Sequence, residues 1–136
     1  MAYLIMIIAS LELFPKVNAI DYDVQSGTQV VNNVIGWFDN NDYLTYNSLN
    51  FGPSGTTKRV QLRYSKGSNG GKIELRIGGP TGTLIGEYSP TNTGNWSVYR
   101  TVYIEIDDVI GIQDLTLVGK DYVGGVMNID WFELSA

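Results

Sequence analysis

Two tryptophans lie in polar, turn-rich stretches of this 136-residue chain, where an aromatic ring is accessible to a ligand. Trp37 precedes the polar run 38–42, and Trp96 follows the turn-forming residues 93–95. An indole stacks on the C–H-rich face of a pyranose ring, and a side-chain amide such as that of Asn128 bonds sugar hydroxyls. A single loop tryptophan is more often structural, but two in separate Asn- and Gly-rich loops favour a sugar site.

The chain contains no cysteine and no histidine, which excludes much of enzyme chemistry. It has no disulfide, thiol nucleophile or zinc thiolate site, and it has no Ser-His-Asp triad or imidazole base. The net charge of -5 and the pI near 4.5 disfavour a nucleic-acid partner, which selects for basic patches. Carboxylate catalysis, binding of hard cations through oxygen, and recognition without catalysis remain.

Carboxylates are present, but they carry no catalytic motif. A glycosidase needs two of them about 5–10 Å apart, and the candidates are Glu74, Glu87, Glu105 and Asp130. None lies in a pattern typical of a catalytic pair, so we expect no enzyme. Residues 39–42 lack the spacing and the closing Glu of an EF-hand, and we expect them to cap a turn.

Alternating apolar and polar residues predict strands rather than helices. Residues 58–65 and 72–77 alternate on either side of the Gly-rich turn 66–71. Further strand-like runs, separated by turn residues, cover 43–49, 84–88, 98–106, 114–118 and 127–134. Because no linker or repeat divides the chain, these short strands predict one all-β sandwich or barrel.

The same alternation gives the predicted sheets a polar face. In residues 59–64 the two arginines and Gln61 lie on one side and the apolar residues on the other. Glu74 and Arg76 lie on the polar side of residues 72–77. A polar face is either solvated or holds a ligand, and the pattern leaves both interpretations open.

The N-terminus carries an apolar run, residues 2–9, which read AYLIMIIA. This run is too short to span a bilayer, which takes about 20 residues. A signal peptide is one interpretation, with a small-residue end at 17–19, but no Lys or Arg precedes the run. We expect residues 1–13 to form an apolar strand or an extension derived from a linker or from cloning, and residues 14–136 to form the domain.

Five sequence blocks, taken together and in this order, are specific enough to indicate a protein family. They are residues 14–27 (FPKVNAIDYDVQSG), 36–46 (GWFDNNDYLTY), 71–76 (GKIELR), 93–96 (TGNW) and 128–134 (NIDWFEL). The sequence resembles the family 6 carbohydrate-binding modules. The resemblance implies a jelly-roll β-sandwich of two antiparallel sheets that binds β-linked polysaccharide, such as β-1,3-glucan or xylan, without catalysis. It also implies attachment to a secreted bacterial glycoside hydrolase, and we expect a monomer with no membrane span and no nucleic-acid partner.

The resemblance further implies two clefts. In the family's loop-end cleft, a sugar lies between two aromatic rings and is held by an Asn. The matching residues here are Trp37, Trp96 and Asn128. The second cleft lies on a sheet face, and its matches are Gln25, Tyr43 and Glu74.

Members of the family commonly read Glu-Ala-Glu before an Asp-Tyr pair, and those carboxylates help to hold a structural calcium ion with an Asp near the C-terminus. This chain reads Asn18-Ala19-Ile20 at that place. Asn18 still offers an oxygen and Asp130 is retained, but Ile20 has no side-chain ligand. The resemblance therefore implies a calcium site at Asn18 and Asp130 that is weakened, shifted or lost.

Two other functions stay open on the sequence alone. One is a small carboxylate-based polysaccharide hydrolase or lyase, which would release sugar as an isolated domain. The other is a structural or adhesion sandwich that binds protein through its apolar N-terminus, which would self-associate with concentration.

Overall fold

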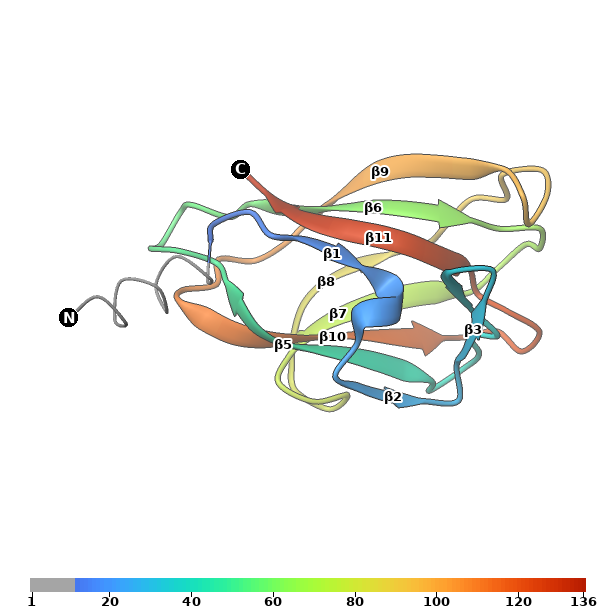
Figure 1. The fold of residues 1–136 in the computed structure, drawn as a ribbon, viewed down its shortest axis with the longest axis horizontal. Helices are drawn as coiled ribbons and strands as arrows, with labels where there is room; N and C mark the ends of the chain where they lie inside the picture. The colour runs from blue at the N-terminus through green and yellow to red at the C-terminus, as the bar shows by residue number, and fades with distance from the viewer. Residues whose placement is uncertain (1–11) are drawn as a thin grey trace.

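The computed structural model describes residues 12–136, and this part of the chain is almost entirely β-structure (Figure 1). The expectation of an N-terminal apolar strand falls on residues that mostly lie outside this description. No helix within residues 12–136 is long and apolar enough to cross a membrane. The elements in chain order are β1 (Lys16–Asn18), the 3₁₀ turn η1 (Ala19–Asp21), β2 (Val24–Ser26), β3 (Gln29–Val31), β4 (Val34–Gly36), β5 (Tyr43–Asn50), β6 (Arg59–Ser65), β7 (Lys72–Ile77), β8 (Thr83–Tyr88), β9 (Tyr99–Glu105), β10 (Ile112–Lys120) and β11 (Asn128–Ser135).

The strands form two antiparallel sheets that lie face to face, as the two layers of Figure 1 show. One sheet has the order β3-β4-β11-β6-β9, with β1 also paired to β11. The other has the order β2-β5-β10-β7-β8. The predicted all-β sandwich of two antiparallel sheets is therefore confirmed.

The core lies between the sheets and follows from the period-two alternation. In β6, Val60, Leu62 and Tyr64 are buried, and the polar residues between them face outward. At one margin the Tyr46 hydroxyl donates a 2.6 Å hydrogen bond to the carbonyl of Ala19 in η1. This bond ties the N-terminal segment to the core, because Tyr46 is itself only 1% exposed.

Antiparallel pairing brings one set of strand ends to a single end of the sandwich. Asn128, the first residue of β11, pairs with Ser65, the last residue of β6. Ser65 in turn pairs with Tyr99, the first residue of β9. On the other side of β11, Ile129 pairs with Ile35 near the end of β4. The loops that follow β4, precede β9 and precede β11 are therefore neighbours, although they are far apart in sequence.

Candidate functional site

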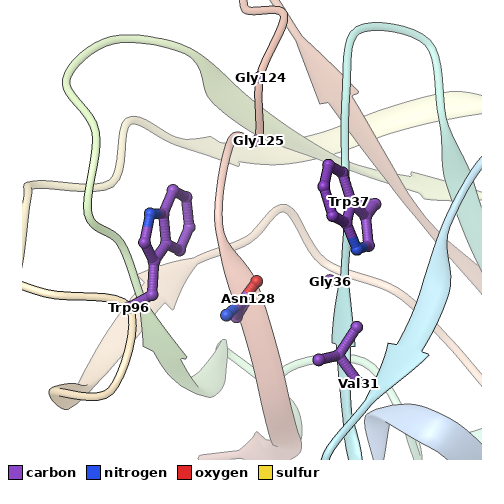
Figure 2. A pocket seen from close by; sticks show the side chains of 7 residues that line it. All are labelled: Val31, Gly36, Trp37, Trp96, Gly124, Gly125 and Asn128. Atoms are coloured by element: carbon purple, nitrogen blue, oxygen red, sulfur yellow. The ribbon is translucent and has the colours of Figure 1, made fainter.

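A cleft of about 300 Å³ opens at this end of the sandwich (Figure 2). Its lining combines two aromatic rings, one amide, one aliphatic side chain and three glycines, and no lining residue is ionisable. The residues are Val31, Gly36, Trp37, Trp96, Gly124, Gly125 and Asn128. The cleft brings together all three residues that the sequence analysis placed in the loop-end site.

Trp37 directly follows β4 and points its indole out of the sandwich. Its neighbours Gly36 and Phe38 are buried, whereas Trp37 is 62% exposed. Its φ of 55° lies in the left-handed region, which a bulky residue rarely adopts. Such strain costs about 1–3 kcal/mol and persists only where the surroundings enforce it. The buried neighbours enforce it here, and the strained backbone turns the ring toward the cleft.

Trp96 lies against two glycines that bring it close to the backbone. A Cβ atom on Gly67 would lie 2.6 Å from Cδ1 and Nε1 of the indole, and one on Gly125 would lie 3.1 Å from its far edge. The Trp96 carbonyl also accepts a 2.7 Å hydrogen bond from the Ser65 hydroxyl. The loop is therefore fixed to the end of β6, and only a residue without a side chain fits beneath the ring at position 67.

Asn128 lies between the two indoles at the base of the cleft (Figure 2). A Cβ atom on Gly36 would lie 3.2 Å from its side-chain oxygen, so glycine at position 36 keeps the space in front of the amide open. Within residues 12–136 the Asn128 amide makes no hydrogen bond to the protein. Its donors and its acceptor are therefore available to a ligand.

Three contributors to the cleft carry no recognisable sequence signal. Val31 comes from the short strand β3, Gly67 resembles any turn glycine, and Gly125 precedes Asn128 without a motif. Their contribution depends on contacts between loops that are remote in sequence, and no local pattern reports such contacts.

The outer face of the five-stranded sheet holds Tyr43 and Glu74, two of the three residues expected in the second cleft. Tyr43 pairs with Val118, and Val118 pairs with Glu74, so the three side chains share one face. Gln25 pairs with Leu44, which is fully buried, and therefore lies on the opposite face. The side-chain oxygen of Gln25 instead accepts hydrogen bonds from the amide and hydroxyl of Thr28. The structure thus brings Tyr43 and Glu74 to one face, but not Gln25.

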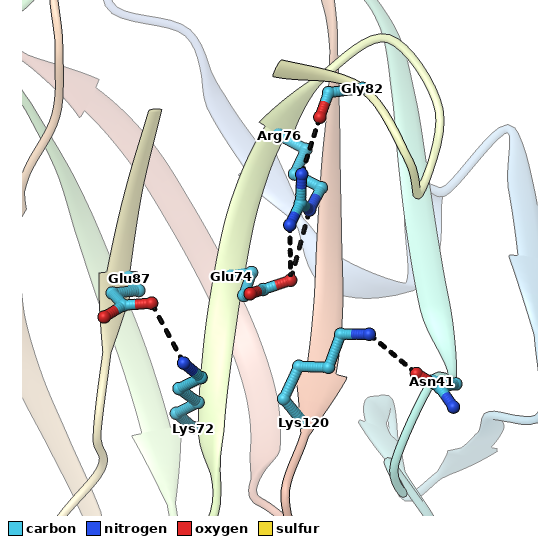
Figure 3. Close-up of polar contacts among 7 residues, drawn as sticks. All are labelled: Asn41, Lys72, Glu74, Arg76, Gly82, Glu87 and Lys120. Carbon is cyan, nitrogen blue, oxygen red and sulfur yellow. Dashed lines mark hydrogen bonds and ion pairs between the residues drawn. The ribbon is translucent and has the colours of Figure 1, made fainter. Parts of the chain in front are cut away.

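Polar groups on this face are largely bonded to one another (Figure 3). Glu74 is only 7% exposed and forms a 3.1 Å ion pair with Arg76, which also donates to the Gly82 carbonyl at 2.7 Å. Lys72 pairs with Glu87 at 3.2 Å. A ligand here would bind beside these pairs or compete with them.

The residues expected to hold calcium have other partners in this structure. Asp130 lies at an irregularity in β11, and its Oδ2 accepts a 3.1 Å hydrogen bond from Nε of Arg63. Asn18 pairs with Trp131 across β1 and β11, and Ile20 packs against the core. No group of three or more acidic, His or Cys side chains able to hold a metal exists among the described residues. Calcium takes about 6–8 oxygen ligands, whereas here the retained carboxylate has a guanidinium as its partner.

The candidate catalytic carboxylates do not line the loop-end cleft. Glu74 and Glu87 are paired across β7 and β8, and each bonds a cation. Glu105 and Asp130 belong to the other sheet, and Asp130 pairs with Arg63. The site therefore offers surfaces for stacking and hydrogen bonding and no acid–base pair.

Comparison with known proteins decides the family. The family model described as carbohydrate binding module (family 6) matches residues 18–136. The chain belongs to this family. It is therefore a carbohydrate-binding module, which is a non-catalytic domain. The predicted family and the prediction that the chain is not itself an enzyme are both confirmed.

Solved structures of the family resemble this module closely. A family 6 module from Clostridium cellulolyticum, solved in complex with xylose, is 34% identical with a TM-score of 0.82, and the match covers 90% of this chain and 98% of that one. A β-1,3-glucan-binding family 6 module from Bacillus halodurans is 31% identical with a TM-score of 0.80, covering 92% and 100%.

Among curated proteins, an endo-1,4-beta-xylanase A from Thermoclostridium stercorarium is 30% identical over 129 residues, which are 90% of this chain and 19% of the xylanase. A second endo-1,4-beta-xylanase A from the same organism is 30% identical over 131 residues, which are 24% of that protein. The module thus spans about a fifth to a quarter of these two relatives, which are much larger enzymes.

Proposed function

We propose that the module binds a neutral β-linked polysaccharide of the xylan or β-1,3-glucan type in the loop-end cleft. The observation that carries this proposal is the placement of the unbonded Asn128 amide between the indoles of Trp37 and Trp96. A pyranose ring between the indoles buries its C–H faces while its edge hydroxyls meet the amide. The related modules with xylose and with β-1,3-glucan specificity support the choice of ligand class.

The chemistry of the lining favours a neutral sugar. None of the residues that line the cleft carries a charge, so the cleft offers no counter-charge to a uronic acid or a sulfate. Stacking therefore supplies most of the affinity. Removing roughly 100 Å² of apolar surface from water contributes about 2.5 kcal/mol at 25 cal/mol per Å², and hydroxyl contacts add to this.

We infer that the module is attached to a glycoside hydrolase, secreted from a bacterium, and acts as a monomer that keeps the enzyme on its substrate. The xylanases that contain a matching segment support the attachment. The outer face around Tyr43 and Glu74 is the second, lower-ranked candidate site, since those two side chains share that face.

Calorimetry with xylo-, laminari- and cello-oligosaccharides tests the proposal. Trp37→Ala and Trp96→Ala each remove roughly 50–100 Å² of stacking surface, so affinity should fall about 10- to 70-fold. Tyr103→Ala is the matched control, because Tyr103 is 54% exposed on β9 and does not line the cleft. Full retention of affinity by both tryptophan variants would refute the loop-end cleft, and a loss confined to Tyr43→Ala would move the site to the sheet face.

A further inference from the structure

Lys66 is a fully buried lysine that lies behind the loop-end cleft and has no carboxylate partner among the described residues. It follows β6 directly, and its ammonium donates to the Val126 carbonyl at 2.6 Å and to the Ser68 hydroxyl at 3.1 Å. The ammonium also lies 5.2 Å from the centre of the Tyr122 ring. Burial lowers the pKa of Lys66, since loss of hydration disfavours the charged form.

A buried charge without an ionic partner is unfavourable for stability. Its bonding partners indicate what Lys66 contributes instead. Val126 directly follows Gly124 and Gly125, two of the three glycines that line the cleft. The Ser68 hydroxyl, which accepts a hydrogen bond from Lys66, donates one to the Gly125 carbonyl at 3.0 Å. Lys66 and Ser68 therefore bond two backbone carbonyls within residues 124–126, which we call the glycine segment.

The backbone of Lys66 holds the Trp96 loop at the same time. Its amide donates to the Thr93 hydroxyl at 3.0 Å, and its carbonyl accepts from the Thr93 amide at 2.9 Å. Gly67, the next residue, lies beneath the Trp96 indole. One short stretch of chain thus joins the Trp96 loop to the glycine segment.

The other side of the glycine segment is bonded to the Trp37 turn. One oxygen of the Asp39 carboxylate accepts from the amides of Gly124 at 3.0 Å and Gly125 at 2.7 Å. The Val126 amide donates to the Phe38 carbonyl at 2.7 Å. The segment therefore links the two aromatic walls, with its amides bonded on the Trp37 side and its carbonyls on the Trp96 side.

We propose that Lys66, acting with Ser68, is a positioning residue that sets the separation of Trp37 and Trp96 by fixing the glycine segment between them. The proposal rests on the proposed function, since the spacing matters only if a sugar lies between the rings. Lys66 does not line the cleft and acts through the backbone of residues 124–126.

Lys66→Met tests the proposal, because methionine keeps the length of the side chain and removes its charge and its donors. Hydrogen exchange of the amides in residues 122–127 should become about tenfold faster, because tenfold corresponds to the free energy of one hydrogen bond to a charged group. Affinity for xylohexaose or laminarihexaose should fall by a similar factor. Global stability in urea should change little, because loss of the buried charge offsets loss of the bonds. Lys58→Met is the matched control, since Lys58 precedes β6 as Lys66 follows it and is exposed.

Unchanged exchange in residues 122–127 would overturn the proposal, and so would faster exchange with unchanged affinity. If Lys66→Met does not fold, Ser68→Ala decides by the same two measurements, because it removes the bond to Gly125 and one bond to Lys66. If the wild-type module binds no oligosaccharide, the proposed function fails, while the exchange experiment still decides whether Lys66 holds the segment.

Discussion

Glycine at position 37 should give a more stable module than alanine does, although both substitutions remove the indole. Trp37 has a φ of 55° and is 62% exposed, so truncation of its side chain sacrifices little core packing. The two variants differ mainly in how they tolerate the left-handed backbone. Alanine retains the clash between Cβ and the backbone, whereas glycine does not.

The size of the difference follows from two opposing costs. A left-handed conformation costs a residue with a Cβ about 1–2 kcal/mol, and the extra freedom of glycine in the unfolded chain costs about 0.5–1 kcal/mol. The free energy of unfolding should therefore be about 0.5–1 kcal/mol higher for Trp37→Gly than for Trp37→Ala. With a urea slope of about 1–3 kcal/mol per M, the midpoints should differ by roughly 0.2–1 M.

Urea unfolding followed by far-UV circular dichroism measures this difference, and Tyr103 supplies the control pair. Tyr103 is an exposed residue of β9 without a positive φ, so there glycine should be less stable than alanine by about 0.5–1 kcal/mol. The order of the two variants should therefore reverse between positions 37 and 103. Equal or greater stability of Trp37→Ala relative to Trp37→Gly would refute the assignment of backbone strain to the cleft.

Two further predictions concern ions and pH. Because Asp130 is bonded to Arg63, a chelator should change neither the melting temperature nor oligosaccharide affinity, and a fall in melting temperature on chelation, reversed by calcium, would contradict this. Two tyrosines predict a loss of stability in alkaline solution. Burial raises the pKa of Tyr46, and burial, with a smaller effect of the hydrogen bond to Tyr64, raises the pKa of Tyr88 to about 12. Since the unfolded chain loses these protons near pH 10, their contribution to stability is complete below about pH 10. It falls as the pH rises further, up to about pH 12 for Tyr88 and to a higher pH for Tyr46. Urea midpoints at about pH 9 and pH 11 should show this fall, and a fall of the same size in Tyr88→Phe would contradict the share assigned to Tyr88.

The long strands were predictable because their alternation is local. Residues 43–49, 84–88 and 98–106 were predicted as strands and correspond to β5, β8 and β9 within one residue at every end. Their inner faces pack in the core, so the pattern and the tertiary contacts agree.

The short strands β1 to β4 were not predicted, since three residues are too few to display a period. One signal was nevertheless available. Asn32 and Asn33 connect β3 to β4 with φ values of 50° and 64°, the positive pair that a two-residue hairpin turn requires. Asparagine tolerates this conformation better than most residues, so the Asn-Asn pair between two valine-rich runs was a hairpin signal.

Gln25 shows where assigning site residues one by one from a family resemblance becomes unreliable. Gln25 lies in β2, an edge strand of three residues, and its register places it opposite the buried Leu44. A shift of one residue in a strand moves every side chain to the other face. Ser26, its neighbour, shares the face with Tyr43 instead. Short edge strands contain too few alternating residues to fix the register from sequence.

Lys66 was the least predictable part of the site. A lysine at the start of a Gly-rich turn is normally exposed, because burial of its charge is unfavourable. Here the ammonium is enclosed by groups from residues 68, 122 and 126, which come from two different loops. Only the folded arrangement of those loops provides the two acceptors that make the burial tolerable.

In this cleft, the residues that would bind a sugar differ from the residues that position the walls. The residues that would touch a sugar are uncharged and supply stacking and hydrogen bonds, whereas the charged groups Asp39 and Lys66 lie behind them and bond the same glycine segment from opposite sides. Loss of an indole removes contact area that any pyranose would use, so it weakens all ligands of the cleft together. A change at Asp39 or Lys66 alters the spacing of the walls, which xylan and β-1,3-glucan chains would use differently. Preference between ligands is thus expected to respond to these supporting charges more than to the tryptophans themselves.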